Sequence, residues 1–144
     1  MPLRIPTDAC SFCDYLAGRR RFTILDRNEL VAMLVTREQR GVGHVLVVPV
    51  QHRPSILDLC DGESAALMDG VRRASAALAG CHDPDGIAVW QNNGTPAHQT
   101  VPHVHFHVAG TLPEGGTRWG PVPALDLAET DRIADALRPH LPPA

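Results

Sequence analysis

The chain has 144 residues, of which 44% are hydrophobic and 20% are charged, the composition of an ordinary globular protein that can bury a core. Its formal net charge of −3 argues against a general binder of nucleic-acid polymers, which carries a basic stripe. All 13 basic residues are arginine, which excludes a Schiff-base lysine and the lysine of a phosphate-binding loop.

The chain also lacks the apolar segments that membranes require. No apolar run approaches the length of a transmembrane helix, and the first ten residues, MPLRIPTDAC, lack the apolar centre of a signal peptide. We therefore expect a cytoplasmic protein without membrane association. The four cysteines then stay reduced unless they bind a metal.

The first half of the chain predicts three strands and a helix. Residues 21–36 read as a hairpin around the turn Asp26-Arg27-Asn28, and residues 44–50 read as a buried strand whose pairing ends at Pro49. Residues 61–80 predict the main helix, with Asp61 as its N-cap and Gly80 as its stop. The inward stripe of this helix is Leu67, Val71, Ala74 and Leu78.

The second half predicts two further strands and a shorter helix. Residues 86–92 and 100–110 alternate as strands do, and residues 111–124 read as an extended, Gly- and Pro-rich tail. Residues 126–138 predict a short helix whose inward side chains are Leu127, Ile133, Ala134 and Leu137. The chain is thus predicted to be a single α+β domain over residues 1–144, with about five antiparallel strands and one main helix.

Three histidines alternate with apolar residues in TVPHVHFHVAG, residues 100–110. Side chains at i, i+2 and i+4 of a strand share one face, so His103, His105 and His107 form a row. Val104, Phe106 and Val108 would then face the core. Burying three unpaired imidazoles is costly, so the row indicates a metal site, a catalytic site or both.

The CxxC motif Cys10-Ser11-Phe12-Cys13 has three readings: half of a zinc site, a redox motif or chance. A redox motif requires a thioredoxin-like βαβ context, which the chain does not predict. A zinc site requires two more ligands, for which His52 and one member of the histidine row are the natural candidates. Cys60 and Cys81 compete for this role, but we expect them to be ordinary thiols.

The run from His103 to Ala109 resembles the signature of the histidine triad (HIT) family, in which three histidines alternate with apolar residues. The motifs CSFC, GHVLVVPVQH and NNG precede it in the order typical of the family. The resemblance covers residues 8–110 and leaves residues 111–144 as a C-terminal extension. It implies a HIT-like fold with an N-terminal segment held by zinc, and a homodimer in which the sheets pair edge to edge.

The resemblance also implies nucleotidyl transfer through a covalent nucleotidyl-histidine. The middle histidine, His105, would attack an α-phosphorus, and water would then release the nucleoside monophosphate. A neutral imidazole suits this role, and its second nitrogen should donate to a fixed acceptor such as a backbone carbonyl. The implied substrates are small purine nucleotide conjugates: nucleoside phosphoramidates, dinucleoside polyphosphates or adenylylated adducts.

By the same resemblance, further residues acquire roles. The phosphate contacts would be Asn92, Gln99, Thr100 and His107. A structural zinc would bind Cys10, Cys13, His52 and His103, a closed tetrahedral set. His44 is expected to make structural hydrogen bonds rather than bind metal.

Three positions are unusual for the family. His98 stands where a glycine is usual, and it could crowd the phosphate, contact it or protonate the leaving group. Thr36 stands where many relatives have Asp or Asn on the ribose, and Trp119 could close over a substrate or pack on the body.

Two other functions remain open at this stage. One is a zinc-stabilised nucleotide-binding module with little turnover. The other is a metalloenzyme in which all three histidines bind one catalytic metal.

Overall fold

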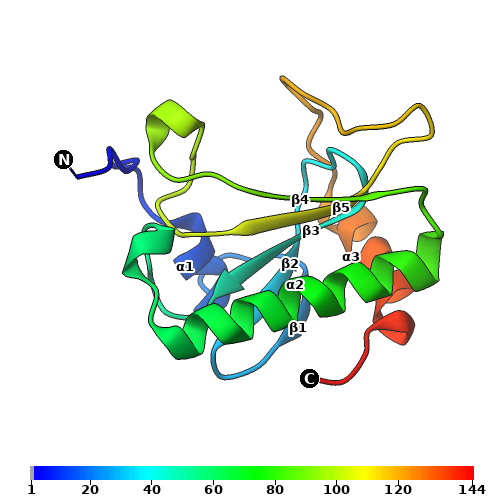
Figure 1. The fold of residues 1–144 in the computed structure, drawn as a ribbon, viewed down its shortest axis with the longest axis horizontal. Coiled ribbons are helices and arrows are strands. Elements are labelled where there is room, and N and C mark those ends of the chain that lie inside the picture. The colour runs from blue at the N-terminus through cyan, green and yellow to red at the C-terminus, as the bar shows by residue number, and fades with distance from the viewer. Residues whose placement is uncertain (1) are drawn as a thin grey trace.

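The computed structural model describes residues 2–144. Its centre is a five-stranded sheet in the order β1-β2-β3-β5-β4, with each neighbouring pair antiparallel (Figure 1). The strands are β1 (Ile24–Arg27), β2 (Val31–Val35), β3 (Val42–Pro49), β4 (Ile87–Gln91) and β5 (Phe106–Gly110). The predicted α+β class and the five antiparallel strands are confirmed.

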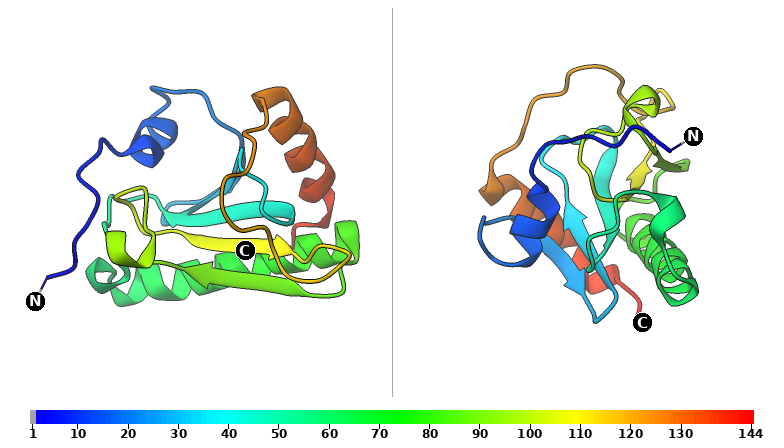
Figure 2. Two further views of the ribbon diagram at one scale, coloured as in Figure 1. Left: turned by 90° about the horizontal axis from the view of Figure 1, so that it is seen from above. Right: turned by 90° about the vertical axis from the view of Figure 1, so that its left-hand side faces the viewer.

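Helices cover both faces of the sheet (Figure 2). The long helix α2 (Asp61–His82) and the C-terminal helix α3 (Leu127–Leu137) cover one face, whereas the short helix α1 (Ser11–Leu16) packs on the other. Three single 3₁₀ turns complete the elements: η1 (Ile56–Asp58), η2 (Thr95–Ala97) and η3 (Arg138–His140). No helix within residues 2–144 combines the length and apolar character needed to cross a bilayer.

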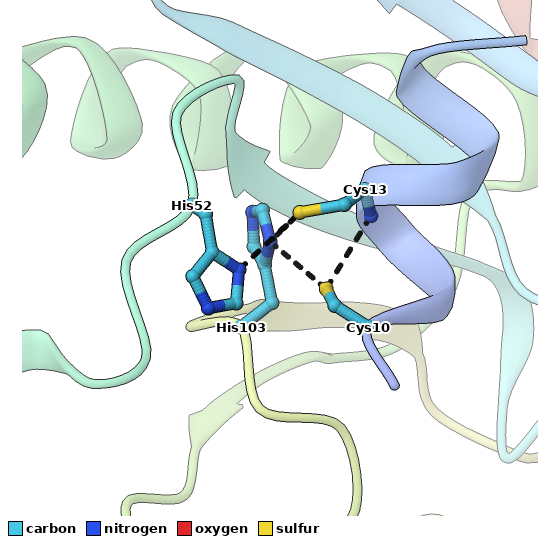
Figure 3. Close-up of side chains that lie close together, drawn as sticks. All are labelled: Cys10, Cys13, His52 and His103. Carbon is cyan, nitrogen blue, oxygen red and sulfur yellow. Dashed lines mark hydrogen bonds between the residues drawn. The ribbon is translucent and has the colours of Figure 1, made fainter. Parts of the chain in front are cut away.

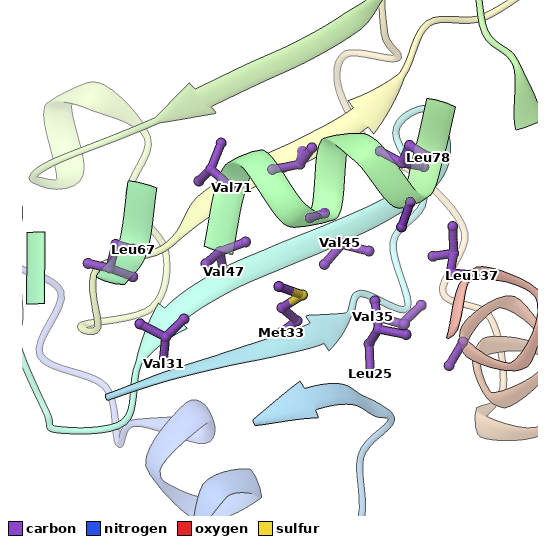
Figure 4. Packing of buried hydrophobic residues seen from close by; sticks show 14 residues of the cluster. Leu25, Val31, Met33, Val35, Val45, Val47, Leu67, Val71, Leu78 and Leu137 are labelled. Carbon is purple, nitrogen blue, oxygen red and sulfur yellow. The ribbon is translucent and has the colours of Figure 1, made fainter. Parts of the chain in front are cut away.

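The main core lies between α2, α3 and the sheet (Figure 4). The predicted stripe of α2 is confirmed, since Leu67, Val71, Ala74 and Leu78 are all buried. The helix can approach the sheet closely at Gly70, where an added Cβ would lie 2.8 Å from Val47 Cγ1. The second, smaller core on the opposite face consists of Phe12, Leu16, Ala32, Leu34, Leu46 and Val48.

The main helix differs from its prediction at both ends. Its N-cap is Cys60 rather than Asp61, and it continues past Gly80 to His82, where Asp83 adopts a left-handed conformation with φ of 45°. Gly80 serves packing instead of termination, because a Cβ there would lie 2.9 Å from Nδ1 of His140.

The hairpin and the last strand also differ from their predictions. β1 includes Arg27, so the turn lies one to two residues later than expected. β5 begins only at Phe106, because its pairing with β3 ends at Val47 and its pairing with β4 ends at Gln91, and residues 100–105 join neither ladder. Val104 and Val108 are buried and Phe106 is half-buried against the main core, as the alternation predicted.

The segment after β5 is attached to the loop between β2 and β3. Arg118 N donates to Arg40 O at 2.7 Å, the Arg40 guanidinium donates to Gly120 O at 2.7 Å, and Leu125 N donates to Arg37 O at 2.8 Å. The extension then adds Ala134 and Leu137 of α3 to the main core. The short C-terminal helix is confirmed, with Asp126 as its N-cap.

Candidate active site and metal cluster

The three alternating histidines lie where β5 begins, and only His107 lies within the strand. One side-chain bond and one backbone bond hold the segment that precedes β5 in place of a ladder. His103 Nε2 bonds to Pro49 O at 2.8 Å, and Val104 N donates to Arg53 O at 2.7 Å. His103 and His105 are therefore anchored to the end of β3 and the loop that follows it.

The ring of His105 has a defined orientation and a defined tautomer. Its Nδ1 lies 2.8 Å from His103 O, and because a carbonyl can only accept, Nδ1 carries the proton and Nε2 keeps a free lone pair. Burial lowers the pKa of His105 below its ordinary value, so the ring is neutral at pH 7. Phe12 of α1 meets the ring edge-on, with centroids 5.1 Å apart and planes at 89°. The backbone-carbonyl acceptor expected from the sequence is present.

His107 is oriented by His44. The backbone N–H of Arg40 donates to His44 Nδ1 at 3.1 Å, so His44 carries its proton on Nε2. This Nε2 lies 3.0 Å from His107 Nδ1, which must accept, and His107 therefore carries its own proton on Nε2. Burial lowers the pKa of His44 to about 4 and also that of His107, so both rings stay neutral. His44 has the hydrogen-bonding role that the sequence predicted.

Trp90 is a site residue that the sequence reasoning missed. Its ring stacks on His107, with centroids 4.6 Å apart and planes at 5°. The two residues are cross-strand partners of β4 and β5. The alternation of side chains in GIAVWQN could have indicated it. When this strand pairs with the histidine strand, Trp90 lies on one of its two faces, and in the observed register that is the face of His107.

Four side chains from three parts of the chain form a second cluster beside the triad (Figure 3). Cys10 and Cys13 come from the start of α1, His52 from the loop after β3, and His103 from the segment before β5. One ligand atom from each lies within 4.8 Å of the others. The structure thus brings together the four residues that the sequence proposed as metal ligands.

The geometry of this cluster fits a tetrahedral cation. The sulfur-to-nitrogen distances are 3.4 Å for Cys10 and His103, 3.2 Å for Cys13 and His52, and 3.6 Å for Cys13 and His103. Ligand atoms around tetrahedral zinc lie about 3.5 Å apart at Zn–S of ~2.3 Å and Zn–N of ~2.0 Å. The bond from His103 Nε2 to Pro49 O leaves Nδ1 as the free lone pair that faces the sulfurs.

The protonation of the cluster differs between its two kinds of ligand. Burial and the neighbouring Cys10 raise the pKa of the Cys13 thiol to about 11, so a cation must displace its proton. Burial lowers the pKa of His103 to about 4, which keeps its Nδ1 free.

A metal bound by all three triad histidines does not fit. His103 has no nitrogen left for a shared metal, because its Nδ1 faces the cysteines and its Nε2 bonds to Pro49 O. The Nδ1 atoms of His105 and His107 face a carbonyl and His44. Within residues 2–144, the cluster of Cys10, Cys13, His52 and His103 is the one group found to suit a metal ion.

The predicted phosphate contacts differ in their availability. The Gln99 side chain is 3% exposed and fully occupied by the loop: its oxygen accepts from Gly94 N at 2.7 Å, and its nitrogen donates to Pro54 O and Val101 O. Asn92 is half-buried and Thr100 is exposed, and within residues 2–144 neither side chain has a hydrogen-bond partner. The neighbouring Asn93 takes the loop-bonding role, since its oxygen accepts from Ile56 N at 2.8 Å.

The three unusual residues have distinct environments. His98 is exposed and has φ of 69°, so the position does adopt the left-handed conformation that favours glycine. The Thr36 hydroxyl accepts from Glu38 N at 3.3 Å. Trp119 is 87% exposed, so within this chain it does not pack on the body of the protein.

Known proteins share both the sequence pattern and this fold. The family model for the HIT domain matches residues 20–113. An adenosine 5′-monophosphoramidase of Schizosaccharomyces pombe is 30% identical over 112 residues, which cover 78% of this chain and 79% of the relative.

Two solved structures extend the comparison. A HIT-like protein from Bartonella henselae has a TM-score of 0.86 at 20% identity and covers 96% of this chain and 100% of its own. A zinc-bound histidine triad family protein from Mycobacterium smegmatis has a TM-score of 0.75 at 25% identity, over 90% of this chain and 93% of its own. The chain therefore belongs to the HIT domain family.

Proposed function

We propose that this protein is a nucleotide hydrolase or transferase that cleaves at an α-phosphorus through a nucleotidyl-histidine intermediate on His105. The observation that carries the proposal is the bond from His105 Nδ1 to His103 O at 2.8 Å. This bond leaves Nε2 unprotonated on a neutral ring, which is the form that acts as a nucleophile.

The proposed reaction has two displacements. His105 Nε2 attacks the α-phosphorus, a nitrogen–phosphorus bond forms, and the bond to the leaving group breaks. The leaving group keeps the electron pair of that bond and takes a proton from the solvent. Water then attacks the same phosphorus and gives a proton back to the solvent, the nucleoside monophosphate departs, and the electron pair of the nitrogen–phosphorus bond returns to Nε2. Both steps move charge onto the phosphate oxygens, which hydrogen-bond donors stabilise.

Other residues of this chain supply those donors and the positioning. His107 donates from Nε2 to a phosphate oxygen, because His44 already occupies its Nδ1. Asn92 and Thr100 have side chains free to reach the phosphate. Gln99 supports the loop from Gly94 to Val101 rather than offering a free donor. His98, Thr36 and Trp119 remain candidates for the leaving group, the ribose and closure of the site.

We further propose that the cluster of Cys10, Cys13, His52 and His103 binds a structural zinc ion. Two thiolates and two imidazoles form a closed set for zinc, so the ion would crosslink the chain. It would hold α1, and with it Phe12, against the segment that carries His105. Thiolate ligands also suit a reducing compartment, in keeping with a cytoplasmic location.

The first substrate to test is an adenosine 5′-phosphoramidate, given the similarity to a monophosphoramidase; dinucleoside polyphosphates are the second class. For the assembly, we propose a homodimer in which two sheets pair along β4, an outer strand of the sheet.

Replacing His105 by alanine tests the mechanism. The variant lacks the nucleophile, so kcat for adenosine 5′-phosphoramidate should fall by at least about a thousandfold. The measurement is ammonia or AMP release, paired with metal analysis and circular dichroism. His82→Ala, which removes an exposed histidine outside the site, should keep wild-type activity.

The same assay separates the alternatives. Folded His105→Ala with its metal and normal turnover would contradict the proposal. A wild-type protein that binds AMP but turns over no phosphoramidate or polyphosphate would instead be a nucleotide-binding module. Trapping an acid-labile AMP adduct on His105 in the wild type would identify the intermediate directly.

A further inference from the structure

Three aromatic rings from three strands pack together beside the proposed nucleophile. Trp90 of β4 stacks in parallel on His107 of β5 at 4.6 Å, and His44 of β3 lies 5.2 Å from each of them. His107 in turn lies 4.9 Å from His105. Within this cluster of three rings, only Trp90 and His107 are stacked in parallel, and His44 is tilted against both.

The orientation of His107 depends on two different contacts. The hydrogen bond from His44 selects which nitrogen of His107 accepts. The parallel contact with Trp90 fixes the plane of the ring. A half-turn of the His107 ring would keep the parallel contact but break the bond, and a tilt would keep the bond but lose the parallel contact. Only the two together hold a single direction for Nε2–H.

A strand position alone does not require this arrangement. Trp90 lies on an outer strand and is half-buried, where an aliphatic residue would satisfy strand preference equally. Cross-strand partners are the closest side-chain neighbours in an antiparallel pair, so this position controls the face of the His107 ring directly.

We propose that Trp90 is a positioning residue that holds His107 so that its Nε2–H faces the phosphate attacked by His105. The inference rests on the proposed function of His105 and His107. Trp90 acts only through His107 and makes no contact with the reacting atoms in this account.

Three variants test the proposal through the kinetics of adenosine 5′-phosphoramidate hydrolysis. Trp90→Leu removes the ring and should lower kcat by about tenfold, equivalent to ~1.4 kcal/mol of transition-state stabilisation, with little change in KM. Trp90→Phe keeps a flat ring and should restore most of the rate. Phe22→Leu is the matched control, because Phe22 is also half-buried and lies away from the triad. Its ring stacks on Tyr15, with centroids 4.0 Å apart and planes at 9°. The kcat of this variant should match that of the wild type.

Nitrogen-15 NMR of the imidazoles provides a readout that does not depend on turnover. In the wild type and in Trp90→Phe, His44 and His107 should each show a single Nε2–H tautomer. In Trp90→Leu, the bond from His44 should still set the tautomer of His107, but the His107 ring is no longer held in one plane, so its ring signals should broaden or split. The signals of His44, which stays bonded to Arg40 N, should stay sharp. A stable, folded Phe22→Leu should leave both signals unchanged.

The outcomes distinguish this inference from the proposed function. If Trp90→Leu retains sharp, single His107 ring signals and wild-type kcat, the inference is wrong and the role of His105 stands. If Trp90→Phe loses as much activity as Trp90→Leu, the flat ring is not what matters and the inference is also wrong. If His105→Ala retains activity, the proposed function fails, whatever the Trp90 variants do.

Discussion

Glu63 is an acidic side chain that is only 2% exposed, yet it belongs to a connected set of contacts. Both of its oxygens accept from Arg53 Nε, at 3.0 and 3.1 Å, and one also accepts from Cys60 N at 3.0 Å. Burial on its own would raise the pKa of Glu63, but these donors outweigh it and lower the pKa below 4.5. Because Arg53 O also holds Val104 N, the pair links the start of α2 to the triad segment.

We predict that Glu63→Gln lowers the free energy of unfolding by about 1–2 kcal/mol at pH 7. This is less than for a fully buried ion pair, because Arg53 is partly exposed and water screens its charge. A lowered native pKa stabilises the fold above the pKa of the unfolded chain, and this contribution is lost as the pH falls through the native value. The gap between variant and wild type should therefore be full above pH 4.5 and close in more acidic solution. Urea unfolding across pH 3–7 measures it.

Asp69→Asn is the control for this prediction. Asp69 lies on the same helix and pairs with Arg72 at 2.8 Å, but its side chain is 39% exposed. It should change the stability by less than about 0.5 kcal/mol at any pH. A gap for Glu63→Gln that stays constant with pH would contradict the assignment to the carboxylate.

At the residue level, the sequence located chemistry better than it located side-chain contacts. The CxxC motif indicated half of a metal site, and the resemblance to the HIT family supplied the full set of Cys10, Cys13, His52 and His103, which the structure brings together. Gln99 was assigned to the phosphate, yet its amide bonds to the backbone, and Trp90 was not singled out. Both differences depend on which atoms meet in three dimensions, which an amide or an indole in a sequence does not specify.

β4 is an edge strand with exposed apolar side chains, as in strands that pair with a second chain. Within residues 2–144 it pairs only with β5, so its outer backbone groups have no ladder. Ile87 and Val89 are 38% and 47% exposed on it. Open, apolar strand edges associate readily, which supports the proposed homodimer along this edge.

We predict that Val89→Lys converts the dimer to monomers at micromolar concentration, because a lysine on an edge strand opposes pairing with another edge. Sedimentation velocity measures the distribution. Leu30→Lys is the matched control, because Leu30 is also exposed, at 44%, and lies in the turn between β1 and β2. This turn is near the edge of the sheet opposite to β4. Dimers in Val89→Lys, or monomers only in Leu30→Lys, would contradict pairing through β4.

At the element level, strongly periodic segments were predicted well and their ends less so. The inward stripe of α2 followed from helical spacing, but the helix passes Gly80 because His140 packs there from a distant segment. The six-residue helix α1 was not predicted, since CSFCDYL is too short to show periodicity. The early residues of the histidine strand lie outside the ladder, where the His103 side chain and Val104 N bond to Pro49 O and Arg53 O instead.

The whole molecule is asymmetric about its sheet. The core between one face and the helices α2 and α3 contains 14 buried residues, whereas the core between the other face and the short helix α1 contains six. The metal cluster lies on this thinner side and connects residues that are up to 93 positions apart. The proposed zinc ion would crosslink the chain there and so offset the smaller apolar core.

We predict that removing the proposed zinc with a chelator lowers the Tm by on the order of 10 °C, the shift that ~3 kcal/mol of binding energy gives a chain of this size. Metal removal should also lower the protection of backbone amides unevenly along the chain. Amides of α1 and of residues 100–105 should exchange faster with deuterium, because the ion holds these segments together. Amides of α2, β2 and β3 should stay protected by the main core.

Two cysteine variants make this prediction specific to the cluster. Cys13→Ser removes a ligand and should reproduce the chelator's effect without any chelator present. Cys60→Ser changes an exposed thiol outside the cluster, so it should retain one metal per chain. Because Cys60 is the N-cap of α2 and serine is a favoured N-cap, the Tm should be no lower than that of the wild type. If protection is lost to the same extent across the whole sheet, the ion supports the entire fold rather than α1 and residues 100–105. If Cys13→Ser leaves the Tm unchanged, no structural metal binds at the cluster.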